Sequence, residues 1–293
     1  MIAWMFITAM LSRAPSDTSA LHLHRSIQHL ADSLHAEIGV SFYDLETSAR
    51  FNFNEHLMLH AASTMKVPVM IEVFRQAEVG KFKLDDSLLV KNEFKSIVDG
   101  SPYSMDIGED SDESIYKQIG RRMTIRQLVE QMITVSSNLA TNILIELVDA
   151  KNVMATLHSL GIKNMQVLRG VEDGKAYERG LNNRTDAYDL MLTMKAIAER
   201  RAASPEACDE MLEILKRQKF RNKIPAGLPE NIVVANKTGD ITSIDHDAAI
   251  VFPPNRKPYI LVLLTHNIED HKTAAQTIAR ISKMIWQEYV AAK

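Results

Sequence analysis

The chain has 293 residues, of which 46% are apolar and 24% charged, so it can bury a full core and is not disordered by composition. Its formal net charge is −3 with no basic stripe, which argues against nucleic acid or an anionic membrane and favours a small or neutral partner. The single cysteine, Cys208, excludes an intrachain disulfide and a cysteine zinc cluster. We expect no metal site and no cofactor.

The chain begins with an apolar run, MIAWMFITAML, that is too short to span a bilayer and is followed by Ser12, Arg13, Ala14 and Pro15. Such a run is typical of a signal peptide, although no Lys or Arg precedes it. We therefore expect residues 1–19 to be a signal peptide or another apolar N-terminus. Residues 20–293 would then form one domain of a bacterial protein that is periplasmic or secreted.

Helical periodicity over residues 20–36 predicts the first helix, and the alternating stretch AEIGVSFYDLET predicts a strand. RFNFNEHLM follows a short polar turn, so the two strands should form a hairpin. A mostly helical middle runs from Ser63 to about Arg221. Strand-like runs then return in NIVVANKTG, HDAAIVFPP and PYILVLLTH, and the last segment, KTAAQTIARISKMIWQEYVAA, has the pattern of an amphipathic helix.

These elements predict an α+β fold with a five-stranded antiparallel sheet, flanked by N- and C-terminal helices and interrupted by an all-helical insertion at about residues 63–221. A ligand site is expected at the seam between the sheet edge and the insertion. The acidic stretch at residues 99–114 is predicted to be a solvated loop, in which Tyr103 is a candidate for the pocket mouth.

Ser63 and Lys66 form an S-x-x-K pattern at the predicted start of a helix. Three residues is close to one helical turn, so both side chains project from the same face and can touch. A lysine amine whose pKa is lowered by burial can take the proton of a serine hydroxyl. The helix N-terminus adds unpaired N–H groups near a developing oxyanion. Alone, the pattern is weak, because it occurs by chance in chains of this length.

Ser136, Ser137 and Asn138 open another predicted helix, SSNLATNILIELV. A hydroxyl at Ser136 can pass a proton to a leaving nitrogen, and the amide of Asn138 can bind both a lysine and a substrate carbonyl. The same residue types are also preferred as helix caps, which is the simpler interpretation of the triplet taken by itself.

Lys237, Thr238 and Gly239 lie at the end of an apolar strand-like run. A lysine and a hydroxyl on an edge strand can hold a substrate carboxylate, while the glycine leaves the strand bare so that a substrate backbone can lie against it. A plain turn is the alternative for this triplet.

The order of the patterns strengthens each of them, because S-x-x-K and S-x-N each open a helix and K-T-G follows on a late strand. The set resembles the active-site signature of class A β-lactamases and penicillin-binding proteins, and the order of elements follows class A over nearly the whole chain after residue 20. The resemblance implies that Ser63 is the acylated nucleophile and Lys66 its base. It assigns Ser136 and Asn138 to the second motif, Lys237, Thr238 and Gly239 to the third, and the oxyanion hole to the N–H groups of Ser63 and Asp240.

Class A enzymes also carry a loop glutamate, in an E-x-x-L-N motif, that positions the water for hydrolysis of the acyl-enzyme. The segment from Glu178 to Asn182 has this spacing, so Glu178 is our candidate for the base and Asn182 for a binding residue. Glu172, three residues after Arg169, is a rival.

The sequence departs from the family pattern at two places. Ser137 stands where class A enzymes have an aspartate, and the strand HDAAIVF lacks the arginine that often binds a penicillin carboxylate. Arg184, Arg221 or His246 could substitute for that arginine.

The resemblance therefore implies a serine β-lactamase in which Ser63 attacks the lactam carbonyl, Lys66 accepts its proton, Ser136 protonates the leaving nitrogen and Glu178 activates water. The alternatives are a DD-peptidase or esterase with the same residues, and a penicillin-binding sensor that acylates without turnover. The expected partner is a small β-lactam or a peptidoglycan-like peptide, with no nucleic acid, no membrane span and a monomeric protein.

Overall fold

The computed structural model describes residues 17–291, so most of the predicted signal peptide lies outside the described residues. The helices are α1 (Asp17–Leu34), α2 (Lys66–Glu78), α3 (Glu113–Tyr116), α4 (Ile125–Thr134), α5 (Asn138–Val148), α6 (Ala150–Ser159), α7 (Gly174–Glu178), α8 (Ala187–Ala198), α9 (Pro205–Lys216) and α10 (His271–Trp286). Short helical turns are η1 (Ala62–Met65), η2 (Ile107–Glu109), η3 (Ile224–Gly227) and η4 (Gln287–Ala291).

The main sheet has five antiparallel strands in the order β2-β1-β11-β10-β9, which confirms the predicted fold. Its members are β1 (Glu37–Asp44), β2 (Arg50–Phe53), β9 (Val233–Ile241), β10 (Ile244–Phe252) and β11 (Tyr259–His266). The remaining strands form small pairs: β3 (Leu59–His60) with β8 (Arg184–Thr185), β4 (Ser87–Leu89) with β7 (Arg122–Thr124), and β5 (Phe94–Lys95) with β6 (Pro102–Tyr103).

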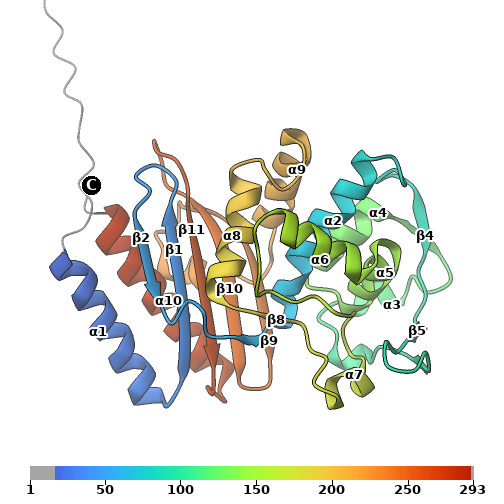
Figure 1. Ribbon diagram of the computed structural model, residues 1–293, viewed down its shortest axis with the longest axis horizontal. Coiled ribbons are helices and arrows are strands. Elements are labelled where there is room, and N and C mark those ends of the chain that lie inside the picture. Colours follow the sequence, from blue (N-terminus) through green and yellow to red (C-terminus); the bar gives the residue numbers. More distant parts are fainter. Residues whose placement is uncertain (1–16, 292–293) are drawn as a thin grey trace, which may run out of the picture.

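Both faces of the sheet are covered by helices (Figure 1). Successive side chains of a strand point to opposite faces, so alternate residues of β11 enter separate cores. Leu261 and Leu263 pack with Ile27 of α1 and Ile278 of α10, whereas Val262 packs on the side of the helical insertion. This double burial explains why β11 is apolar along nearly its whole length.

Helix α8 of the insertion packs across one face of the sheet, while η1 and α9 meet the sheet at β9, which is an edge strand. Helix α2 runs through the insertion with most of its residues buried, and η1 directly before it lies against β9. The seam therefore brings the end of β9, with its K-T-G pattern, next to the start of α2, with its S-x-x-K pattern. Within residues 17–291, no helix is both long and apolar enough to span a membrane.

Candidate active site

Ser63 lies in η1, one turn before α2, and faces a pocket of about 780 Å³ at the seam. The backbone around it is tightly constrained. Ala62 has a positive φ of 45°, an uncommon conformation for a residue with a side chain, and its N–H donates to His60 Nδ1 at 3.0 Å. The Ser63 hydroxyl makes no hydrogen bond with any described residue and is open to the pocket.

Gly239 is the point at which β9 contacts η1. A Cβ atom placed on this glycine would lie 2.9 Å from the backbone N of Ser63 and 3.1 Å from that of Thr64. Such contacts are too short for a side chain, so only glycine allows the strand to approach the serine this closely. The glycine of the third motif therefore sets the distance between the two walls of the site.

Lys66 is fully buried and donates to three acceptors of the second motif. Its Nζ lies 2.8 Å from Ser136 O, 3.3 Å from Ser136 Oγ and 2.8 Å from Asn138 Oδ1. Burial lowers the pKa of Lys66 to about 8, although the carboxylates of Asp110, Asp240 and Glu172 act in the opposite direction. A sizeable fraction of this amine is therefore neutral near physiological pH and able to accept a proton.

Lys237, on β9, contacts the side chain of Ser136. Its Nζ donates to Ser136 Oγ at 2.9 Å and to Thr238 O at 2.7 Å. Burial, followed by the charge of Lys66, holds the pKa of Lys237 well below its usual range. The Ser136 hydroxyl thus lies between two buried amines and can exchange a proton with either.

The second motif is held in place by a carboxylate that the sequence patterns did not reveal. Ser136 has a φ of 60°, and Ser137 caps α5 by accepting from the N–H of Ala140 at 3.3 Å. Asp110 accepts from the N–H of Asn138 at 3.0 Å and of Leu139 at 2.9 Å. A carboxylate from another loop therefore lies at the start of the helix that Ser137 caps.

The burial of Asp110 corrects the prediction of a fully solvated loop at residues 99–114, because Asp110 and Asp112 are only 7% and 6% exposed. Tyr103 is not at the pocket mouth either. Its hydroxyl donates to Val171 O at 3.3 Å and accepts from Asn142 Nδ2 at 3.2 Å, so it supports the loop that precedes Glu172.

Glu172 is the loop glutamate that the structure brings to the site. Its Oε1 accepts from Asn138 Nδ2 at 2.9 Å and its Oε2 from the N–H of Asp106 at 3.0 Å. Burial raises the pKa of Glu172, while these two hydrogen bonds oppose the shift. The residue also has a positive φ of 59°, an uncommon backbone conformation for a residue with a side chain.

Glu178, the predicted loop base, is placed elsewhere. It is the last residue of α7, it is exposed, and its side chain makes no hydrogen bond or ion pair with another described residue. Asn182, predicted to bind substrate, accepts instead from a guanidinium nitrogen of Arg169 at 2.9 Å. The E-x-x-L-N segment therefore lies at the end of the loop, which contacts between Arg169 and Asn183 hold together.

The three candidates for a carboxylate-binding cation also lie outside the pocket lining. Arg184 donates to Met58 O, and Arg221 to Val234 O. His246 is fully buried, and its Nε2 donates to His60 O at 2.9 Å, so it supports the turn before the nucleophile. Among the described residues, no group of three or more side chains is placed to hold a metal ion.

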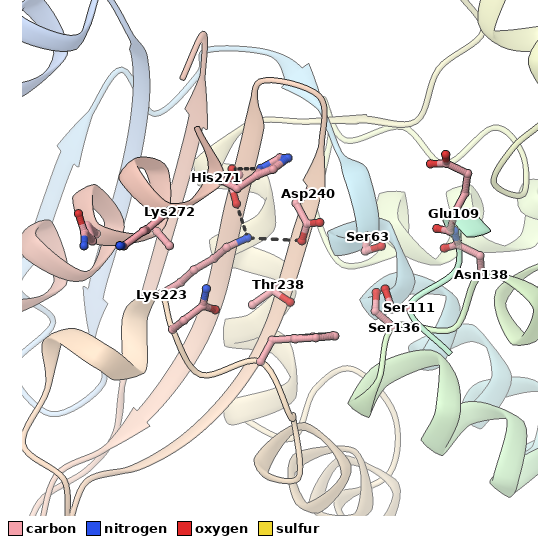
Figure 2. A pocket seen from close by; sticks show the side chains of 15 residues that line it. Ser63, Glu109, Ser111, Ser136, Asn138, Lys223, Thr238, Asp240, His271 and Lys272 are labelled. Carbon is pink, nitrogen blue, oxygen red and sulfur yellow. Dashed lines mark hydrogen bonds and ion pairs between the residues drawn. The ribbon is translucent and has the colours of Figure 1, made fainter. Parts of the chain in front are cut away.

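A different cation, Lys223, lines the pocket together with residues from both walls. Its side chain is 4% exposed, and its Nζ pairs with Asp245 Oδ1 at 2.8 Å. Figure 2 shows Ser63 and Ser136 on one side of the pocket, and Thr238 and Asp240 of β9 between them and Lys223. The full lining is Ser63, Glu109, Ser111, Ser136, Asn138, Phe220, Asn222, Lys223, Thr238, Asp240, Asp245, His271, Lys272, Ala275 and Gln276.

A sheet interrupted by a helical insertion, with a serine and two buried lysines at the seam, defines the class of penicillin-binding serine hydrolases. The chain matches the model of the β-lactamase enzyme family over residues 22–289, and it belongs to that family. It is therefore an enzyme of the class A β-lactamase type.

Individual relatives are distant. A β-lactamase of Bacteroides uniformis is 25% identical over 277 residues, which cover 90% of each chain. Among solved structures, a β-lactamase of Sphaerobacter thermophilus is 24% identical with a TM-score of 0.78, covering 93% of this chain and 97% of that one. PBP-A is 25% identical with a TM-score of 0.77, covering 91% and 95%, and a variant of it has been solved as an acyl-enzyme with penicillin G.

Proposed function

We propose that the protein is a serine β-lactamase that opens the β-lactam amide through an acyl-enzyme on Ser63. The observation that carries the proposal is the placement of the Ser136 hydroxyl between the amines of Lys66 and Lys237, at 3.3 and 2.9 Å, in the pocket that Ser63 lines. This arrangement brings a nucleophile (Ser63), a base (Lys66) and a proton relay (Ser136) together in one pocket.

In the acylation step, Ser63 Oγ bonds to the lactam carbonyl carbon while neutral Lys66 takes the hydroxyl proton. The C–N bond then breaks, and the nitrogen receives a proton from Ser136, which regains one from Lys66. The N–H groups of Ser63 and Asp240 are the proposed donors to the carbonyl oxygen, and the close approach of Gly239 to Ser63 N is consistent with this role.

In the deacylation step, we propose Glu172 and not Glu178 as the general base. Glu172 shares Asn138 with Lys66, because the amide of Asn138 donates to the glutamate and accepts from the lysine. A water held between Glu172 and the ester carbon would lose a proton to the carboxylate as its oxygen bonds to that carbon. The C–O bond to Ser63 would then break, Ser63 Oγ would regain the proton, and the acid would be released. The raised pKa of Glu172 makes it a stronger base than an exposed carboxylate.

Turnover of a chromogenic cephalosporin by the wild-type protein and the Ser63→Ala variant tests the proposal. We expect hydrolysis by the wild type and a loss of at least about 10³-fold in kcat/KM for the variant. Hydrolysis that survives the substitution would contradict it.

A second candidate is a penicillin-binding protein that acylates and releases its product slowly, or a peptidase that acts on D-Ala-D-Ala peptides. The similarity to PBP-A favours this candidate. It predicts faster turnover of a D-Ala-D-Ala peptide than of a penicillin, together with a penicillin adduct that persists for minutes.

We further propose that the protein is a monomer exported to the periplasm or the medium, where it would confer resistance to β-lactam antibiotics. The proposal of export rests on the apolar run of the first residues. Cell fractionation, sizing of the purified protein and the susceptibility of an expressing strain test these points separately.

A further inference from the structure

Asp240 places an exposed carboxylate in the pocket that Ser63 lines, on β9 two residues after Thr238. Its side chain is 62% exposed and lines the same pocket as Ser63 and Thr238. Residues two apart on a strand share a face and are separated by about 7 Å. A substrate group bound at Thr238 would therefore lie beside the Asp240 carboxylate (Figure 2).

The positive charge of Lys223, which lines this end of the pocket, is already paired with carboxylates of the protein. Lys223 Nζ lies 2.8 Å from Asp245 Oδ1 and 3.6 Å from Asp240 Oδ1. The same amine is also within 3.3 Å of Gly239 O and 3.4 Å of His246 O. Two carboxylates therefore face one ammonium group. Figure 2 shows Asp240 between Ser63 and Lys223, so an acyl substrate on Ser63 would meet the Asp240 carboxylate before the amine.

The neighbouring basic residues on α10 do not neutralise the charge of Asp240. His271 Nδ1 lies 2.7 Å from Asp245 Oδ2, so it interacts with the buried acid and not with Asp240. Lys272 is exposed and lies on the far side of Lys223 from Ser63 (Figure 2). On the opposite wall, Glu109 adds a further negative charge to the lining.

We propose that Asp240 is a specificity-determining residue that disfavours a carboxylate on the leaving-group side of the acyl substrate and favours a neutral or cationic group there. This inference rests on the proposed acyl-transfer function and defines its substrate class. In a pocket without this acidic residue, a lysine and a threonine would be free to bind a substrate carboxylate. Here the negative charge of Asp240 opposes such binding.

The test compares benzylpenicillin with its methyl ester, which differ at the relevant carboxylate. The measured quantity is the ratio of kcat/KM for the ester to kcat/KM for the acid. Like charges about 7 Å apart near a protein surface give an effect on the order of tenfold, so Asp240→Asn should lower the ratio about tenfold by improving the acid. Because Asp240 also acts on Lys66, the rates for both compounds will shift, but that common effect cancels in the ratio.

Two variants serve as controls. Asp240→Glu keeps the charge and should keep the wild-type ratio. Glu213→Gln removes one negative charge from an exposed position on α9, outside the pocket, and should also leave the ratio unchanged. Added salt should lower the wild-type ratio and leave that of Asp240→Asn nearly constant, because an exposed charge is screened.

The outcomes are distinct. A fall in the ratio for Asp240→Asn alone supports the inference, whereas an equal ratio in the wild type and this variant overturns it while leaving acyl transfer intact. If the wild type reacts with neither compound, the proposed function fails and the inference fails with it.

Discussion

The side-chain amide of Asn138 donates to Glu172 Oε1 at 2.9 Å, and this contact connects the loop glutamate to the serine–lysine site. The opposite end of the same amide accepts from Lys66, so the groups proposed for acylation and deacylation meet at one residue. Within the part of the chain that the structure describes, the side chain of Glu178, exposed at the end of α7, makes no comparable contact.

The first prediction separates these two glutamates. Glu172→Gln should slow deacylation about 10²- to 10⁴-fold and cause a penicillin adduct to accumulate, because the variant lacks a base for the water. Glu178→Gln should behave like the wild type. Stopped-flow hydrolysis combined with intact-protein mass spectrometry measures both effects, and an adduct that accumulates in Glu178→Gln alone would reverse the assignment.

The second prediction concerns pH. Because the pKa of Lys66 is lowered to about 8, its amine is mostly protonated below that pH and mostly neutral above it. The rate of acylation should therefore rise with pH through a midpoint near 8, since only the neutral amine accepts the serine proton. Lys66→Arg, which stays charged, should lose this limb along with most of the activity. A flat profile for the wild type between pH 6 and about 9 would exclude Lys66 as the base.

The third prediction concerns the close approach of β9 to the nucleophile. Gly239→Ala would place a Cβ atom 2.9 Å from Ser63 N, so the strand must shift away from η1. We expect kcat/KM to fall about 10²-fold or more, the size of effect caused by losing an oxyanion donor. Gly174→Ala is the matched control, because its added Cβ meets no atom within 4 Å. Equal activity of the two variants would show that the contact is not needed.

The fourth prediction concerns Asp110. Asp110→Ala removes both acceptors from the first N–H groups of α5 and leaves Tyr116 without its partner. The free energy of unfolding should decrease by about 1–3 kcal/mol, as for the loss of a buried hydrogen-bonding group. Acylation should slow as well, because the backbone N–H of Asn138, a neighbour of Lys66, loses its acceptor. Asp110→Asn keeps one acceptor and should be affected less. Chemical denaturation and single-turnover acylation measure the two effects, and unchanged values would show that the helix start does not depend on this carboxylate.

The fold could be predicted because its signals are local. Alternating residues in β1 and apolar spacing in α1 and α10 reveal their elements without knowledge of partners. The late strand β11 is a nearly continuous apolar run, and the structure explains this by the apolar cores on both of its faces. The order of the three short patterns then indicated which ends of these elements meet.

The sequence could not identify residues whose role depends on where a loop runs. Asp110 lies in a strongly acidic stretch that is typical of a solvated loop, and only its packing under α5 shows that it is buried. Lys223 follows two polar residues without a motif, and its partner Asp245 belongs to β10, which is distant from the loop of Lys223 in the sequence. Glu178 has the family spacing, but the positive φ of Glu172 and the links between Arg169 and Asn182 turn the loop so that the earlier glutamate faces the site.

The most direct test of the central claim is to locate the bond between the protein and a β-lactam. The Glu172→Gln variant is incubated with penicillin G, digested and mapped by mass spectrometry, alongside the Ser63→Ala/Glu172→Gln double variant. We predict one adduct with the mass of the intact penicillin on the peptide that contains Ser63, and none in the double variant. An adduct on another residue, or one that persists in the double variant, would contradict the assignment of Ser63 as the nucleophile.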